Sequence, residues 1–182
     1  MQIAVKDIGP SGHREIAEVP IADMPLLMEL VRSEGIGFPV PVMVDIHLVR
    51  QEDSVVVTGT LDTCAALNCS RCLEETTASV HADIRIVFEP ATADADALGE
   101  VVELTEADME RVPYDGDFLD LAAVIQEEVL AAMPLRPLCQ TACKGLCPGC
   151  GANLNESACS CSNTPVDPRL AVLKNWRSDT ES

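Results

Sequence analysis

Alternation of apolar and polar residues is the clearest pattern in the first half of the chain. Within residues 40–50, every second side chain is apolar, at Val42, Val44, Ile46 and Leu48. Residues 76–88 alternate in the same way, and residues 54–67 read as a further strand in which Gly59 marks a bulge or a bend. Three such segments in succession predict an antiparallel β-meander, in a barrel-like sheet, with one face buried.

Helical spacing replaces the alternation later in the chain. Within residues 118–133 the apolar side chains at this spacing are Phe118, Leu121, Ala122, Ile125, Val129 and Ala132. Asp115 and Asp117 precede the segment, where negative charge favours the start of a helix, and prolines after it end the helix. Residues 21–33 and 168–177 predict two shorter helices, each with a proline near its start.

Two stretches have weaker patterns. Residues 1–20 read as an extended lead-in, and residues 89–104 open with an Ala- and Asp-rich stretch that predicts a mobile loop followed by a short strand. Hydrophobic residues make up 47% of the 182, enough for one core, although only 3% are aromatic. We therefore predict an α+β fold: a mainly antiparallel β domain over residues 1–138, and a cysteine-rich, zinc-ribbon-like tail over residues 139–182 that packs on a hairpin of that domain.

Charge is distributed unevenly along the chain, which has a formal net charge of −18. Residues 1–88 hold 13 acidic and 6 basic residues, and residues 129–182 hold 4 acidic and 5 basic residues. Between them, residues 89–128 hold 13 acidic residues against Arg111 alone. This middle block would repel a phosphate backbone and attract basic proteins, although charge runs often serve solubility alone.

The N-terminal residues, MQIAVKDIGPSGHRE, lack the basic and then apolar plan of a secretion signal. No apolar run approaches the roughly 18 residues of a membrane span. We therefore expect a cytoplasmic protein with no membrane partner. Cytoplasmic thiols usually stay reduced, so the nine cysteines indicate metal binding or catalysis rather than disulfides.

Close pairs account for eight of the nine cysteines. The pairs are Cys69 and Cys72, Cys139 and Cys143, Cys147 and Cys150, and Cys159 and Cys161. Two residues between thiolates let both sulfurs reach one ion at about 2.3 Å, and Gly149 and Gly151 permit the tight turn of such a knuckle. Eight thiolates suffice for two tetrahedral Zn²⁺ sites, which leaves Cys64 as a small buried hydrophobe in a strand.

Two divisions of these ligands are open. Proximity favours one site from the last four cysteines and another in which Cys69 and Cys72 are completed by Cys139 and Cys143. The second of these sites would staple the tail to the hairpin across 66 intervening residues and restrain the unfolded chain strongly. In the interleaved alternative, the hairpin pair joins the Cys-Pro-Gly-Cys pair instead.

Other cysteine chemistries match the sequence less well. The spacing of Cys143, Cys147 and Cys150 is that of radical enzymes that use S-adenosylmethionine and a four-iron cluster, but a large α/β barrel follows the motif in those enzymes, and only 32 residues follow it here. A redox Cys-x-x-Cys pair needs a thioredoxin-like βαβ setting, whereas these strands read as antiparallel. An iron–sulfur protein, a redox-active protein and a metal buffer are the alternatives to a structural zinc protein.

Catalytic motifs of other kinds are missing from the sequence. It holds no phosphate-binding loop and no nucleophile elbow. The three histidines stand apart, although His47 and His81 could be neighbours across strands. Arg71 could donate to a sulfur or a phosphate, or be a solvated turn residue. We therefore expect no catalytic residues and no enzyme activity.

Several motifs together resemble a known family. They lie at residues 69–74 (CSRCLE), 119–121 (LDL) with the helix that follows to residue 139, 143–155 (CKGLCPGCGANLN) and 167–173 (DPRLAVL). On these motifs the chain resembles the YceD family, the large ribosomal RNA subunit accumulation proteins. The resemblance covers residues 55–175 and is most specific in the tail.

The resemblance implies a non-enzymatic role in large-subunit ribosomal RNA accumulation and ribosome assembly. Some members keep the first Cys-x-x-Cys and a His/Cys pair at the positions of Cys139 and Cys143, but lack the last four cysteines. A lost site should lose its four ligands together, so this pattern implies that the last four form one site. The expected metal ligands, for two Zn²⁺, are Cys69, Cys72, Cys139, Cys143, Cys147, Cys150, Cys159 and Cys161.

The acidic charge then bears on the partner. It favours a basic ribosomal protein, free or within the pre-ribosomal large subunit, that meets residues 89–128. Ribosomal RNA would be contacted indirectly or only by a local basic patch, made of Arg136, Lys144, Arg169, Lys174 and Arg177.

Overall fold

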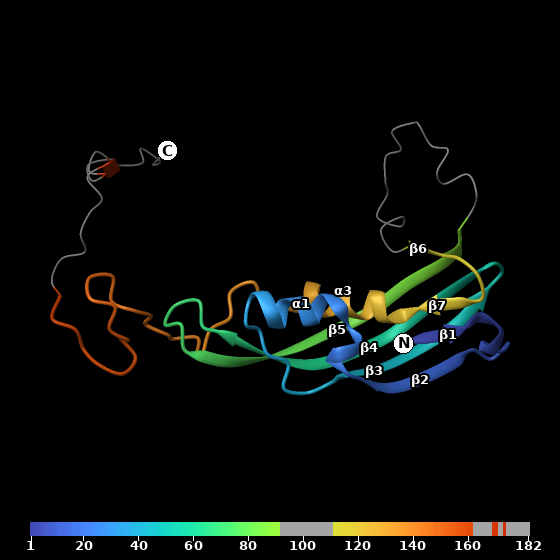
Figure 1. Ribbon diagram of the computed structural model, residues 1–182, viewed down its shortest axis with the longest axis horizontal. Coiled ribbons are helices and arrows are strands. Elements are labelled where there is room, and N and C mark those ends of the chain that lie inside the picture. The colour runs from blue at the N-terminus through green and yellow to red at the C-terminus, as the bar shows by residue number, and fades with distance from the viewer. Residues whose placement is uncertain (92–110, 162–168, 171–172, 174–182) are drawn as a thin grey trace, which may run out of the picture.

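The architecture is a long curved sheet with helices on one face (Figure 1). The computed structural model describes residues 1–91, 111–161, 169–170 and 173. Five strands lie in the order β2 (His13–Val19), β3 (Val42–Gln51), β4 (Ser54–Asn68), β5 (Glu75–Pro90) and β6 (Arg111–Tyr114). A separate two-stranded sheet pairs β1 (Gln2–Ala4) with β7 (Phe118–Asp120). The described helices are α1 (Pro25–Ser33) and α3 (Leu121–Ala132). Short 3₁₀ turns lie at Val5–Asp7 and Ile21–Asp23.

The predicted meander and the α+β class are confirmed. β3 pairs with β4, and β4 with β5, in antiparallel register. β2 adds antiparallel to β3, whereas β6 runs parallel to β5, so the sheet is mixed at one edge. The sheet is open, with β2 and β6 at its edges, and does not close into a barrel.

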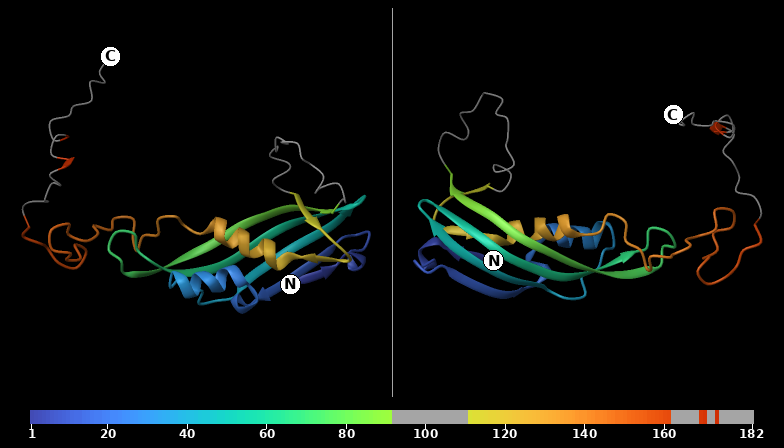
Figure 2. Two further views of the ribbon diagram at one scale, coloured as in Figure 1. Left: turned by 45° about the horizontal axis from the view of Figure 1, so that its top comes forward. Right: turned by 180° about the vertical axis from the view of Figure 1, so that it is seen from behind.

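The core lies between the sheet and the helices. The alternating apolar residues predicted to share a face of β3 are all buried, and Val42 and Leu48 are wholly inaccessible to solvent. Leu27 of α1 and Val129 of α3 close the core from above, while the opposite face of the sheet carries no helix in the described part of the chain (Figure 2). Gln126, also buried, accepts a hydrogen bond from the Leu26 amide at 3.0 Å, so α3 satisfies one free amide at the start of α1.

Residues 1–20 are more ordered than the predicted lead-in. Ile3 of β1 pairs with Leu119 of β7, and Ala17 of β2 pairs with Val44 of β3. The carbonyl of Met1 also accepts a hydrogen bond from the Leu121 amide at 3.0 Å. These partners lie far along the chain, so local patterns could not reveal the pairing.

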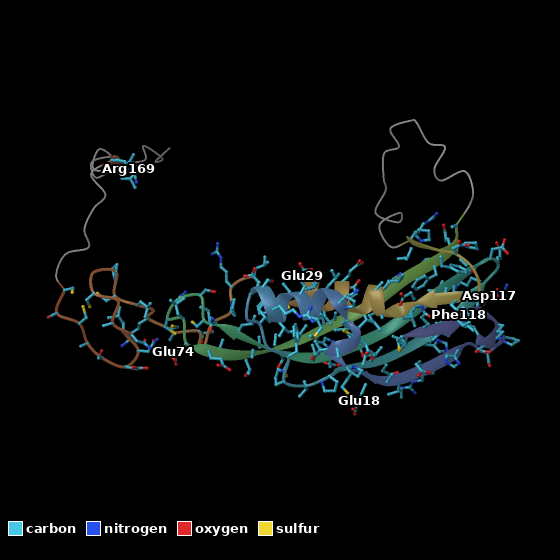
Figure 3. The ribbon with its side chains drawn as sticks, in the orientation of Figure 1. Glu18, Glu29, Glu74, Asp117, Phe118 and Arg169 are labelled. Atoms are coloured by element: carbon cyan, nitrogen blue, oxygen red, sulfur yellow. The ribbon has the colours of Figure 1, made fainter. Side chains whose placement is uncertain are left out.

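The long helix begins at Leu121, three residues after its predicted start. Phe118, predicted in the apolar stripe, lies in β7 and is 55% exposed (Figure 3). Asp120 caps the helix, because its side chain accepts from the Ala122 amide at 3.1 Å, in the role predicted for earlier aspartates. The strand predicted near residues 101–104, most of the predicted 89–104 loop and most of the predicted 168–177 helix lie outside the described residues.

Gly59 is a point of close contact between strands, not a bulge. Strand pairing runs through it without an inserted residue, opposite Ile46 on one side and Ile84 on the other. A Cβ at this position would collide with the carbonyl oxygen of Asp45 and lie 2.7 Å from the Cα of Ile46. Only glycine lets β3 and β4 approach this closely here.

We expect Gly59→Ala to lower the free energy of unfolding by about 1–3 kcal/mol, because the methyl group forces the β3 backbone to move. Gly9→Ala is the control, since a Cβ there meets nothing within 4 Å. Urea titration of the metal-loaded proteins measures both. Equal midpoints for the two variants would show that the strands do not need this contact.

The helix-free face of the sheet carries ion pairs between strands. Arg14 donates from Nε and Nη2 to the two carboxylate oxygens of Asp45, at 2.9 and 2.7 Å. His81 on β5 lies 2.8 Å from Asp62 on β4, from Nδ1 to Oδ1. The hydrogen bond with this carboxylate, and then its charge, raises the pKa of His81 above the ordinary 6.5.

We expect Asp62→Asn to lower the pKa of His81 toward 6.5, measured by NMR titration of the imidazole protons. Because folding raises this pKa, the pair contributes stability below the unfolded pKa and loses it as pH rises through the folded one. Asp45→Asn, which breaks the Arg14 pair instead, should leave the His81 titration unchanged. A His81 pKa that is the same in all three proteins would disprove the pairing in solution.

Candidate metal centres

The turn between β4 and β5 presents the first pair of thiols. Cys69 and Cys72 lie in this turn, with 0% and 3% exposure. The turn is closed by backbone hydrogen bonds from the Leu73 amide to the Cys69 carbonyl, at 2.9 Å, and from the Cys69 amide to the Glu74 carbonyl, at 2.8 Å. Leu73 has a φ of +62°, in the left-handed region, and the Cys69 and Cys72 sulfurs of this turn lie within 4.8 Å of each other.

The segment after α3 docks on this turn. Ser70 donates to the Pro137 carbonyl from both its amide, at 2.8 Å, and its hydroxyl, at 3.0 Å. Arg71 donates from Nη1 to the carbonyl of Cys143 at 2.7 Å, and its own carbonyl accepts from the Leu146 amide at 3.1 Å. These contacts bring the second pair of thiols, from Cys139 and Cys143, to the first.

Four sulfurs meet at this junction. Those of Cys69, Cys72, Cys139 and Cys143 all lie within 4.8 Å of one another. The Cys69 to Cys143 separation is 3.8 Å and the Cys72 to Cys139 separation is 3.6 Å. A tetrahedral site with metal–sulfur bonds of about 2.3 Å has sulfur–sulfur edges of about 3.8 Å, so this group, the hairpin tetrad, has the dimensions that such an ion requires.

The remaining thiols form a second group, the tail tetrad. The sulfurs of Cys147, Cys150, Cys159 and Cys161 lie within 4.8 Å of one another. Cys159 is 3.1 Å from Cys147 and 3.8 Å from Cys150, sulfur to sulfur. The amide of Gly149 donates to the Cys147 sulfur at 3.4 Å, and Gly151, at a φ of +75°, turns the chain behind the knuckle.

Thiol electrostatics favour a cation in both groups. Backbone amides, that of Cys139 first, lower the pKa of Cys69 to about 6, and the Cys159 thiol, followed by backbone amides, lowers the pKa of Cys147 to about 6. Desolvation of its sulfur raises the pKa of Cys139 to about 12, and hydrogen bonding to Cys159 raises that of Cys161 to about 12. The lowered pKa values favour the thiolate forms of Cys69 and Cys147, and a bound cation would stabilise the thiolates of the other cysteines as well.

The eight paired cysteines therefore group as the local division predicts. The hairpin pair lies with Cys139 and Cys143, not with the knuckle pair of the interleaved alternative. Cys143 belongs to a different tetrad from Cys147 and Cys150, so the spacing typical of radical enzymes does not correspond to one shared cluster here. Cys64 lies apart, half-buried on β4 opposite Ser79.

Other predicted contacts differ from the structure. His47 pairs with Thr58 and His81 with Asp62, so the two histidines are not neighbours across strands. The Arg71 side chain donates to the backbone carbonyl of Cys143, while the Arg71 backbone amide donates to the Cys69 sulfur.

Sequence reasoning missed Asn155. Its Nδ2 donates to the Cys143 sulfur at 3.2 Å, which is the main cause of a lowered Cys143 pKa. Asn155 ends the CGANLN segment, which follows the knuckle and could have drawn attention to this residue. However, no spacing between residues in the sequence indicates its contact with Cys143.

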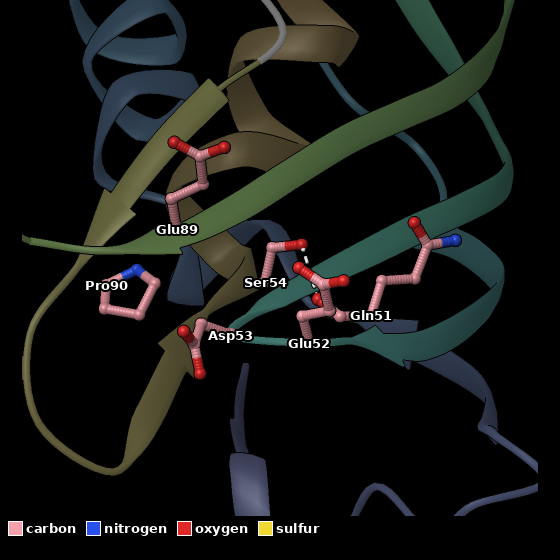
Figure 4. A pocket seen from close by; sticks show the side chains of 6 residues that line it. All are labelled: Gln51, Glu52, Asp53, Ser54, Glu89 and Pro90. Carbon is pink, nitrogen blue, oxygen red and sulfur yellow. Dashed lines mark hydrogen bonds between the residues drawn. The ribbon is translucent and has the colours of Figure 1, made fainter.

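A pocket at the other end of the sheet has a different character. It is lined by Gln51, Glu52, Asp53, Ser54, Glu89 and Pro90 (Figure 4). Ser54 closes the β3–β4 turn through its hydroxyl, which donates to the Gln51 carbonyl at 3.0 Å. Three carboxylates and no basic side chain line the pocket. β4 separates this acidic end from the hairpin tetrad by roughly 45 Å, at about 3.3 Å a residue.

Comparison with known proteins completes this picture. The model of the family described as "Large ribosomal RNA subunit accumulation protein YceD" matches residues 57–176, more than half of the chain. The chain belongs to the YceD family. The matched range includes all eight cysteines of the two tetrads, so both candidate centres lie within the part of the chain that is typical of YceD proteins.

Curated YceD-like relatives are distant. A protein named "Large ribosomal RNA subunit accumulation protein YCED homolog 1, chloroplastic" from Arabidopsis thaliana is 26% identical over 78% of this chain and 50% of its own length. Its namesake from Zea mays is 26% identical over 84% of this chain and 59% of its own length. An uncharacterized protein of Mycobacterium leprae is 29% identical over 82% of this chain and 67% of its own length. The chain thus spans about half the length of the Arabidopsis relative.

Two further findings complete the comparisons. No solved structure matches the chain significantly. Among the described residues, the helices are too short or too polar to cross a bilayer.

We expect two metal ions per chain, counted by native mass spectrometry of protein purified without chelator. With metal in excess, Cys69→Ser/Cys72→Ser and Cys159→Ser/Cys161→Ser should each retain one ion, because each removes half the ligands of one tetrad. Cys64→Ser is the control and should retain two. Loss of both ions from either double variant at saturating metal would contradict two separate sites.

Proposed function

We propose that this chain is a non-enzymatic factor that supports accumulation of large-subunit ribosomal RNA, with structural Zn²⁺ in both tetrads. The family match over residues 57–176 carries the proposal, because the family description names this process and no reaction. The two tetrads support a non-enzymatic role. Four thiolates around one ion leave no open position for a substrate or an activated water.

Zinc is the metal that the ligand set favours. Thiolate-only tetrahedral sites are typical of Zn²⁺ and of iron–sulfur centres, and the sulfurs of each tetrad, all within 4.8 Å of one another, have the spacing of ligands to a single ion. When bound, Zn²⁺ would neutralise half of the negative charge of each set of four thiolates and hold the tail on the β4–β5 turn. We expect the protein to work in a reducing compartment, the cytoplasm, because the thiol ligands must stay unoxidised.

The charge distribution supports a basic protein as the direct partner. The described acidic end combines the carboxylates of Glu52, Asp53 and Glu89 with those of Asp115, Asp120 and Glu127, which line a second pocket beside Phe88. Such an end would repel RNA phosphates and attract the basic surface of a ribosomal protein of the large subunit. Near the cysteine end, the exposed basic residues include Arg136 and Lys144.

The function is tested by the ratio of large-subunit to small-subunit ribosomal RNA in cells that lack this gene. We expect the wild-type gene to restore the ratio, and Cys69→Ser/Cys72→Ser to fail because the tail loses its attachment. Cys64→Ser, the matched control, should restore it. A ratio that does not change on deletion of the gene would refute the proposed function, and a brown protein that contains iron would refute structural zinc.

The partner is tested separately, by measuring binding to large-subunit ribosomal RNA and to purified basic ribosomal proteins at low and high salt. We expect salt-sensitive binding to a ribosomal protein that weakens on Glu52→Lys/Asp53→Lys, because these changes reverse the charge of the acidic end. Reversal of Glu29, on α1 and distant from that end, is the control (Figure 3). Tight RNA binding that survives alanine at Arg136, Lys144, Arg169, Lys174 and Arg177 would overturn this choice of partner.

A further inference from the structure

The two tetrads are joined by a short stretch of chain that both of them shape. Cys143 ends the hairpin tetrad and Cys147 begins the tail tetrad, with only three residues between them. The Leu146 amide in this stretch is bound by the Arg71 carbonyl of the β4–β5 turn, at 3.1 Å. The stretch is therefore attached to the hairpin side, while its far end enters the tail tetrad.

The loop between Cys150 and Cys159 folds back onto this same stretch. The Leu154 amide donates to the Gly145 carbonyl at 2.9 Å, and Leu146 and Asn153 form an isolated antiparallel bridge. Because Cys150 and Cys159 are both sulfur ligands of the tail tetrad, a metal in that tetrad would close this loop and fix its position.

The folded loop carries Asn155 to the hairpin tetrad. Its Oδ1 accepts from the Lys144 amide at 2.8 Å, and its Nδ2 donates to the Cys143 sulfur at 3.2 Å. A backbone amide can only donate, so the Lys144 contact fixes which end of the side-chain amide is oxygen. The other end must be the NH₂ group, and the Cys143 sulfur must accept, as a metal-bound thiolate does.

Asn155 is held in this orientation by its neighbour. The Oδ1 of Asn153 accepts from the Asn155 amide at 3.1 Å and from its Nδ2 at 2.9 Å. Asn153 donates in turn to Glu156 Oε1 at 3.2 Å. Both protons of the Asn155 NH₂ group therefore have acceptors, one of them a sulfur of the neighbouring tetrad.

We propose that Asn155 is a positioning residue through which metal in the tail tetrad stabilises metal in the hairpin tetrad. Metal in the tail tetrad orders the loop, the loop places the Asn155 NH₂ group, and this group stabilises the Cys143 thiolate in the other site. The coupling is reciprocal, since each metal must favour the other equally at equilibrium. The inference rests on the proposed structural metal in both tetrads.

The test is the rate at which metal passes from the loaded, full-length protein to a chromogenic chelator. Asn155→Asp keeps the size of the side chain and the acceptor for Lys144, but turns a carboxylate oxygen toward the Cys143 thiolate. We expect release from the hairpin tetrad to accelerate about 10- to 100-fold, as for loss of other outer-shell partners of metal ligands. The two cysteine double variants, each with one intact tetrad, assign the release phases.

A double-mutant cycle separates coupling from a local effect. Removing the tail tetrad with Cys159→Ser/Cys161→Ser should accelerate release from the hairpin tetrad, and adding Asn155→Asp should then change it less than about twofold. Ser157→Ala, at an exposed position in the same loop, is the matched control and should leave both phases unchanged.

Three results would contradict these expectations. Wild-type protein without metal would refute the proposed structural sites themselves. Two bound ions with release unaffected by Asn155→Asp would overturn the role of Asn155. Fully multiplicative effects in the double-mutant cycle would show that Asn155 acts on Cys143 without coupling the sites.

Discussion

The cysteine module depends on the docking of the chain after α3 onto the β4–β5 turn. Ser70 and Arg71 supply the polar part of this contact, by binding the carbonyls of Pro137 and Cys143. The apolar part is small, with Leu138 and Leu146 packed against the three buried cysteines of the hairpin tetrad. A contact this small cannot offset the entropy of ordering the tail by itself, which is why a metal that binds four thiolates is a physically reasonable source of the remaining stability.

The two longest strands of the sheet determine where in the molecule this docking takes place. β4 and β5 are long and continuously paired, so the turn that bears Cys69 and Cys72 is held far from the helix-covered core. The opposite ends of the same strands lead to the acidic turn at Glu52 and Asp53 and to Glu89. The acidic pocket and the hairpin tetrad therefore lie at opposite ends of the same two strands, so a partner could meet one end without covering the other.

The two tetrads are linked directly through Asn155. The tail tetrad has exposed members, Cys150 and Cys161, whereas three of the four hairpin cysteines are buried. The side-chain amide of Asn155, which comes from the loop of the tail tetrad, donates to the buried Cys143 sulfur of the hairpin tetrad. With metal bound as proposed, this link would make the attachment of the tail to the fold depend on the metal in the tail tetrad.

Sequence alone determined the features that depend on local periodicity and local spacing. The alternation in β3 and β5 identified the buried face, since neighbouring side chains of a strand must point to opposite sides, and the close cysteine pairs identified the candidate metal ligands. Tertiary structure decided what depends on partners distant in the chain. Examples are the pairing of Ile3 with Leu119 and the start of α3 at Leu121. Two others are the close contact of the strands at Gly59, where a bulge was predicted, and the hydrogen bond from Asn155 to the Cys143 sulfur. These contacts join residues whose proximity is created only when the sheet and the turn have formed, so no local pattern in the chain records them.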